Sequence, residues 1–85
     1  MAKTNPHLKA AIMEVVENQI KSNKPPETRE TLNRLTAQGI SKEDAMKYLG
    51  QAVCVELWDN MRNQKKFKQK RFIRNLKNLP AEPAE

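Results

Sequence analysis

The chain has 85 residues and a formal net charge of +6 at pH 7, with 38% hydrophobic and 31% charged residues. This length allows one domain with one small core. No apolar run approaches the roughly 20 residues of a transmembrane helix, and the N-terminal residues lack the apolar segment of a signal peptide. The single cysteine, Cys54, cannot form a disulfide within the chain, so we expect a cytoplasmic protein.

The first half of the chain contains two predicted helices. Asn5 is a good N-cap and Pro6 suits the first helical position, and the apolar residues that follow recur at helical spacing. This pattern predicts a helix over residues 6–22, which ends before two consecutive prolines because proline disfavours helix in the residue before it. A second helix is predicted over residues 26–38, with Gly39 in the left-handed conformation that commonly ends a helix.

Two further helices are predicted in the second half. Ser41 reads as an N-cap with Asp44 three residues on, a variant of the capping box, and predicts a helix over residues 42–62. Its apolar residues cover most of the circumference, which is typical of a central helix. A fourth helix is predicted over residues 68–79, with its apolar residues on one side and Pro80 as its stop.

These elements predict an all-α fold, a small bundle of about four helices with the third helix at its centre. No segment alternates convincingly with the period of a strand. We expect a single helical domain over residues 1–79 and a disordered tail over residues 80–85, because that tail is short and rich in proline. Trp58 is predicted to be largely buried by the first or fourth helix, so that its replacement by alanine costs about 3 kcal/mol or more.

Short motifs along the chain resemble a family of small bacterial proteins of unknown function. The motifs are NPHLK, ENQI, PPETR and LWDNMR, and the spacing from ENQ to PP is the most specific part. The resemblance implies that related segments form the C-terminal part of longer proteins in some members. It also implies histidines, in some members, at the positions of Lys9, Met13 and Lys47, where a pair four residues apart suits a metal site. This chain has none of these histidines.

Motifs for catalysis or for metal binding are weak. The chain has one histidine and one cysteine, and its two glycines are too few for a nucleotide-binding fingerprint. His7 lies in the first turn of the first predicted helix, and Cys54 lies within the apolar segment AVCVELW, which is typical of a buried structural cysteine. We therefore expect no enzymatic activity, no metal and no cofactor.

Two polar residues are predicted to lie where their helices are most apolar. At about 100° per residue, Glu56 falls among the apolar residues of the third helix, and Gln19 falls among those of the first. A buried carboxylate needs a hydrogen-bond partner or must be neutralised. In the structural interpretation Glu56 is satisfied by Gln19, the first candidate, by a threonine of the second helix or by a basic side chain. In the functional interpretation Glu56 is a general acid or base.

The joint between the second and third predicted helices allows a DNA-binding interpretation. The DNA-binding helix–turn–helix prefers a small residue four positions before the turn glycine, where this chain has Leu35. The third helix, which would have to read the DNA, is predicted to be buried. A plain joint between two helices is therefore the favoured interpretation.

The excess positive charge lies in one stretch, RNQKKFKQKRFIRNLKNL, over residues 62–79. It carries eight Lys or Arg and no Asp or Glu, whereas residues 1–61 carry eight basic and eight acidic residues. Because the stretch has no acidic residue, its charges repel one another unless something acidic binds. The predicted contact residues are the basic side chains of this loop and helix: Lys65, Lys66, Lys68, Lys70, Arg71, Arg74 and Lys77.

Three interpretations of this stretch remain open. The leading one is a non-enzymatic binding or structural module that contacts an acidic protein partner, or a second copy of the chain, through the basic fourth helix and the loop before it. The alternative is a protein that binds RNA or DNA without sequence specificity through residues 62–79. The third is a solvated face without a specific ligand. Membrane binding is not expected, because the core needs the apolar face of the fourth helix. The sequence leaves the oligomeric state open.

Overall fold

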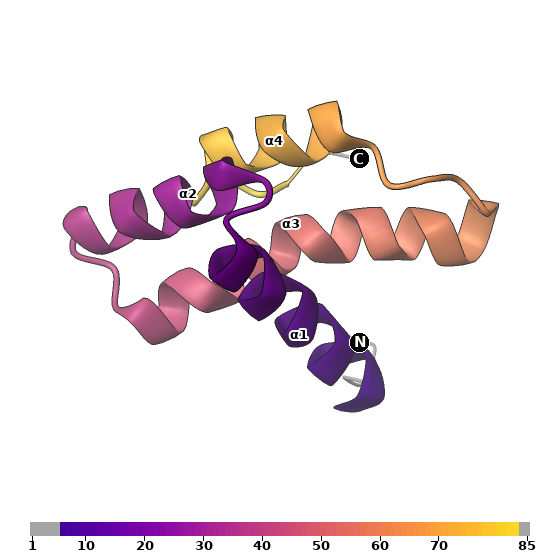
Figure 1. Ribbon diagram of the computed structural model, residues 1–85, viewed down its shortest axis with the longest axis horizontal. Helices are drawn as coiled ribbons and strands as arrows, with labels where there is room; N and C mark the ends of the chain where they lie inside the picture. The colour runs from indigo at the N-terminus through magenta and orange to yellow at the C-terminus, as the bar shows by residue number, and fades with distance from the viewer. Residues whose placement is uncertain (1–5, 84–85) are drawn as a thin grey trace.

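The computed structural model describes residues 6–83 and contains four helices over them. The helices are α1 (Pro6–Ser22), α2 (Pro26–Ala37), α3 (Lys42–Asn63) and α4 (Gln69–Asn78). Helix α3 contacts each of the other three, and α4 runs back along it after the loop at its C-terminal end (Figure 1). The predicted all-α bundle with a central third helix is confirmed, and every helix boundary lies within one residue of its prediction.

Helix α1 is terminated by a residue in the left-handed conformation. Asn23 has a φ of 57°, and the N–H of Lys24 donates to the carbonyl of Gln19 over 3.2 Å. This is the bond of a Schellman motif, which satisfies a carbonyl that the last turn leaves free. The predicted end was therefore right, although Asn23 was not identified as the residue that makes it. The predicted N-cap, Asn5, lies outside the described residues.

The joint between α2 and α3 forms as its sequence predicts. Gly39 has a φ of 96°, and the N–H of Ile40 donates to the carbonyl of Leu35 over 3.1 Å. Two residues on, Ser41 Oγ accepts a hydrogen bond from the N–H of Asp44 over 3.1 Å and caps α3. The two caps stop one helix and start the next within four residues.

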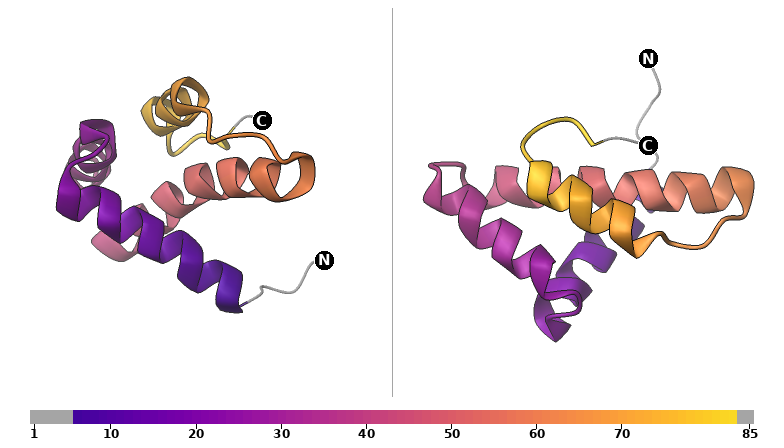
Figure 2. Two further views of the ribbon diagram at one scale, coloured as in Figure 1. Left: turned by 45° about the vertical axis from the view of Figure 1, so that its right-hand side comes forward. Right: turned by 90° about the horizontal axis from the view of Figure 1, so that it is seen from above.

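All four helices contribute to one apolar core. Its buried members are Val16, Leu32, Leu35, Ala45, Leu49, Ala52, Val53, Phe72, Leu76 and Leu79. Helices α1 and α3 cross closely (Figure 2), and at this crossing Gly50 is buried. A Cβ at Gly50 would lie 3.2 Å from Ile12 Cγ2, so the missing side chain sets how near α1 lies to α3.

The prediction of a largely buried Trp58 is wrong. Its exposed fraction is 46%, and that of Met61 on the same face is 63%. Glu56 is turned toward the core, and a residue two positions later points about 200° away from it around a helix. The ring of Trp58 instead lies under the guanidinium of Arg62, 5.5 Å from the centroid. Helix α3 is therefore central but has one outward face.

The chain turns directly after α4. Leu79 is buried, and the N–H of Ala81 donates to the carbonyl of Asn78 over 2.9 Å. Pro80 and Pro83 lie against the outward face of α3, where they line a depression together with Trp58. Residues 84 and 85 of the predicted disordered tail lie outside the described residues.

Candidate functional site

Glu56 is the most buried charged side chain of the candidate site. Its side chain has no exposed surface, and Oε1 accepts a hydrogen bond from the backbone N–H of Lys68 over 2.7 Å. Arg71 donates to it twice, from Nε to Oε2 over 2.6 Å and from Nη2 to Oε1 over 3.0 Å. Both carboxylate oxygens are therefore engaged, by the loop and by α4 (Gln69–Asn78).

The predicted pairing of Gln19 with Glu56 is wrong. Gln19 Oε1 accepts a hydrogen bond from Thr28 Oγ1 over 2.9 Å, which joins α1 to α2. Glu56 faces α4 instead, so of the three kinds of partner considered, the basic side chain is the one present. The buried Glu56 and the half-buried Gln19 thus each tie a different pair of elements together.

Arg71 also binds a second carboxylate. Its Nη2 lies 3.0 Å from Asp59 Oδ2, and Asp59 Oδ1 accepts a hydrogen bond from Asn63 Nδ2 over 2.7 Å. These hydrogen bonds, from Asn63 first and then from Arg71, lower the pKa of Asp59 below its ordinary value. The hydrogen bond with Glu56 in turn raises the pKa of Arg71. Arg71, one of the predicted contact residues, is therefore already paired with two carboxylates within the chain.

The carboxylate of Glu56 also explains how a basic helix begins here. Lys68 is the N-cap residue of α4, and its side chain makes no capping hydrogen bond. Lysines and arginine crowd the first turn, where the helix dipole disfavours cations. Glu56 supplies the missing anion from α3. The sequence placed Glu56 on the core side of α3, but only the packing of α4 against α3 shows what it binds.

The remaining basic side chains divide into groups. Lys68, Lys70 and Arg74 are exposed and, with Gln69 and Arg71, line one depression of about 730 Å³ that we call the cationic depression. Within residues 6–83 the structure shows no ion pair for Lys68, Lys70 or Arg74. These side chains therefore form the part of the predicted surface that the fold gathers in one place.

The other predicted contact residues lie apart from this depression. Lys77 lies with Glu27, Glu30 and Arg34 around another hollow, where carboxylates are already at hand. Lys65 and Lys66 are exposed in the loop, whose position is fixed by a hydrogen bond from Asn60 Nδ2 to the carbonyl of Lys65 over 2.9 Å.

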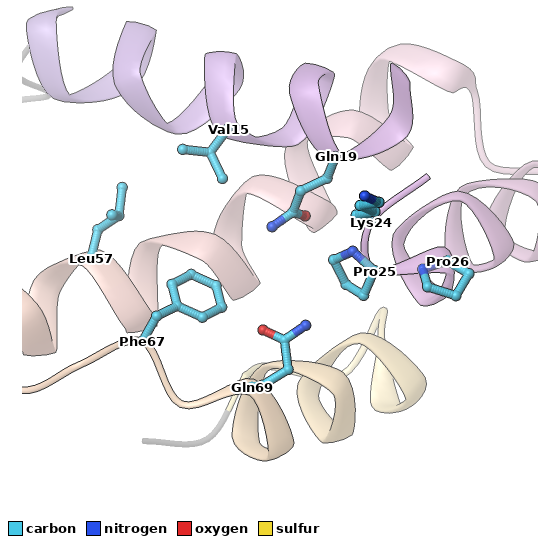
Figure 3. A pocket seen from close by; sticks show the side chains of 8 residues that line it. All are labelled: Val15, Gln19, Lys24, Pro25, Pro26, Leu57, Phe67 and Gln69. Atoms are coloured by element: carbon cyan, nitrogen blue, oxygen red, sulfur yellow. The ribbon is translucent and has the colours of Figure 1, made fainter. Parts of the chain in front are cut away.

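A second hollow, of about 540 Å³, is drawn with its lining side chains in Figure 3, and we call it the apolar pocket. Its lining comes from all four helices and two connecting segments: Val15, Gln19, Lys24, Pro25, Pro26, Leu57, Phe67 and Gln69. Gln69 also lines the cationic depression, so the two hollows share a wall. No carboxylate lines either of them.

Sequence reasoning did not identify the apolar pocket, because its lining spans residues 15 to 69. One signal was present. The motif ENQI contributes Gln19, the motif PPETR contributes Pro25 and Pro26, and LWDNMR contributes Leu57. Three of the four segments that carry the family resemblance thus meet around one hollow.

The residues considered for catalysis or metal binding are dispersed. His7 is exposed at the start of α1, and Cys54 is half-buried on the outward face of α3. The structure brings Lys9, Met13 and Lys47 to one depression between α1 and α3. Over residues 6–83, no three His, Cys, Asp or Glu side chains are grouped so that they could hold a metal ion. None of the helices in that range has the length and apolar character needed to cross a membrane.

The fold and the site together define a small helical bundle in which a buried carboxylate of the central helix holds a basic fourth helix. The chain matches the family described as "Domain of unknown function (DUF1841)" over residues 1–78 and belongs to that family. The resemblance to a family without an assigned function is thereby confirmed. No curated protein and no solved structure matches the chain.

Proposed function

We propose that the chain is a non-enzymatic binding module whose cationic depression docks an acidic segment of a partner protein in the cytoplasm. The observation that carries the proposal is the unequal use of charge around α4 (Gln69–Asn78). Glu56 and Asp59 are both engaged by Arg71, while Lys68, Lys70 and Arg74 stay exposed around one hollow. Gathering like charges costs free energy that an acidic partner recovers.

The engagement of Glu56 supports a module without catalytic activity. A general acid or base needs an oxygen within hydrogen-bond reach of the substrate. Both oxygens of Glu56 already accept hydrogen bonds from Lys68 or Arg71, and the side chain has no exposed surface. Its position supports a role in holding α4 rather than one in chemistry.

The composition of the surroundings favours a protein partner over nucleic acid. Helix α4 has ten residues and is about 15 Å long, so its basic face spans few phosphates. The exposed aromatic side chain of Phe67 lies within the basic stretch and lines the hollow next to the cationic depression. Aromatic residues, Met and Arg are the types enriched in protein–protein interfaces.

Fluorescence anisotropy with a labelled ten-residue peptide of alternating Glu and Asp tests the proposal. At about 50 mM salt we expect the wild-type chain to bind, and we expect the triple variant Lys68→Gln, Lys70→Gln, Arg74→Gln to bind at least about tenfold more weakly. Three exposed ion pairs of about 0.5 kcal/mol each correspond to that ratio.

A second triple variant controls for net charge. Lys9→Gln, Lys21→Gln and Lys42→Gln remove the same charge from exposed lysines around another depression, and should weaken binding by less than about twofold. Equal losses in the two variants would show that the peptide senses only net charge, and would overturn the proposal. Tighter binding of a labelled duplex or single strand of equal charge would overturn it in favour of nucleic acid.

A further inference from the structure

We infer that the apolar pocket receives an apolar side chain of the same acidic segment, so that the partner carries an aliphatic or aromatic anchor beside its carboxylates. This inference rests on the proposed function and deepens it. The pocket and the cationic depression share Gln69, so one short segment reaches both. Figure 3 shows the side chains of Gln19 and Gln69 extending into the space between α1 and α4.

The positive charges around the apolar pocket and the cationic depression favour an acidic partner segment. Lys24 stands at the pocket, and Lys68, Lys70 and Arg74 stand at the neighbouring depression, while no carboxylate lines either hollow. A partner segment that fills the pocket therefore gains by carrying carboxylates on the side of α4. A basic or neutral segment would leave these cations desolvated without a counter-charge.

The walls of the pocket suit an apolar side chain. Val15, Leu57 and Pro25 present aliphatic surface, and the ring of Phe67 closes one side (Figure 3). An apolar anchor in a pocket with a polar rim is the arrangement that concentrates binding energy in small interfaces. The volume of about 540 Å³ leaves room for a Leu or Phe side chain together with part of its backbone.

Polar groups at the rim can orient such a segment. Gln19 Oε1 is held by the hydroxyl of Thr28, which directs its amide nitrogen away from that bond. An amide N–H₂ fixed in this way donates to a backbone carbonyl of an extended segment.

The loop that carries Phe67 is held in place before any partner binds. Asn60 Nδ2 donates to the carbonyl of Lys65, and the N–H of Lys68 donates to Glu56. The ring of Phe67 also packs edge-on against Phe72, with centroids 5.1 Å apart and an interplanar angle of 67°. A wall fixed beforehand loses little conformational entropy on binding.

Three acidic peptides that differ only in the central residue test this inference. Each has four Glu or Asp on either side of a central Ala, Leu or Phe, and binding is measured by anisotropy at about 50 mM salt. On the wild-type chain we expect the Leu and Phe peptides to bind about tenfold more tightly than the Ala peptide.

Two variants of the chain then test where the central Leu or Phe side chain binds. Gln69→Trp, on the exposed rim, fills the pocket and should reduce that preference to less than about twofold.

Gln51→Trp is the matched control. Gln51 is exposed on the outward face of α3 and lines a different depression, so this variant should keep the full preference for Leu and Phe. Equal binding of the three peptides by the wild-type chain would overturn the pocket inference and leave the proposed function standing. Binding of none of them would overturn the proposed function itself. A preference lost in Gln51→Trp but kept in Gln69→Trp would place the anchor on the outward face of α3 and also overturn the inference.

Discussion

The buried carboxylate of Glu56 accepts three hydrogen bonds, and these bonds fix the position of α4 on α3 (Lys42–Asn63). A buried ion pair contributes little net stability compared with well-packed apolar residues, but removing one partner leaves an uncompensated charge. The main effect of the pair of Glu56 and Arg71 is therefore to raise the free energy of any arrangement in which α4 is displaced from α3.

Substitution of Glu56 separates charge from hydrogen bonding. We expect Glu56→Leu to lower the free energy of unfolding by about 3 kcal/mol or more, since it leaves Arg71 and the N–H of Lys68 without their acceptor. Glu56→Gln should cost less, because its amide oxygen still accepts one of these bonds. Urea denaturation measures both, and the exposed Glu14→Gln should change stability by less than about 0.5 kcal/mol. A Leu variant as stable as the Gln variant would contradict this expectation.

Asp59 makes part of the stability depend on pH. Its pKa in the folded chain lies below the ordinary value of 3.8, so its contribution is present above that value and is lost as pH falls through the lowered pKa. We therefore expect the difference in urea midpoint between wild type and Asp59→Asn to be largest near neutral pH and to shrink below about pH 4. A difference that stays constant from neutral pH to about pH 3 would show that Asp59 acts without its charge.

Single residues also mark where reasoning from the sequence reaches its limit. The helical position of Glu56 predicted its burial, because Glu56 falls among the apolar residues of α3. Its partner depends on how a later helix packs, and the choice of Gln19 was wrong for that reason. Trp58 was misjudged because the apolar residues of α3 extend round to its outward face, and the pattern does not show which of them a neighbouring helix covers.

At the scale of the helices, the capping residues made the helix boundaries predictable from the sequence. Ser41 with Asp44, and Gly39 before them, each act over a few residues, and the structure shows the bond from the N–H of Asp44 to Ser41 and the left-handed Gly39. The apolar pocket is the opposite case, since it forms only when all four helices are in place. Local chemistry is visible in the sequence, whereas a surface made from distant segments is not.

The two glycines should respond differently to alanine. At Gly39 a Cβ meets nothing within 4 Å, so Gly39→Ala costs only the left-handed conformation, about 1 kcal/mol. At Gly50 the gain in helix propensity, about 1 kcal/mol, is offset by the contact of the new Cβ with Ile12, so Gly50→Ala should be close to neutral. Gly50→Leu should cost about 2 kcal/mol or more, because it forces α1 away from α3. Thermal unfolding gives the order, and a stabilising Gly50→Leu would contradict the close crossing.

For the whole molecule, residues 1–61 have equal numbers of acidic and basic side chains, and the positive charge is concentrated in residues 62–79. This uneven distribution affects stability as well as binding. Between about 10 and 150 mM salt the Debye length falls from about 30 to about 8 Å, which screens the repulsion among the basic side chains of α4 and its loop. We expect the Tm of the wild-type chain to rise over this range. The triple variant Lys68→Gln, Lys70→Gln, Arg74→Gln lowers the net charge from +6 to +3 and should show a smaller rise. An equal rise in both would place the repulsion elsewhere.

Helix α4 is held at both ends by side chains of other helices. Glu56 accepts the N–H of Lys68 at its start, and Arg34 donates to the carbonyl of Leu76 over 3.0 Å near its end. A helix of ten residues is too short to be stable alone in water. Folding and recognition are therefore thermodynamically linked. A partner at 100 times its Kd would stabilise the whole bundle by about 2.7 kcal/mol. A synthetic fragment of residues 62–79 would carry the same charges without their arrangement.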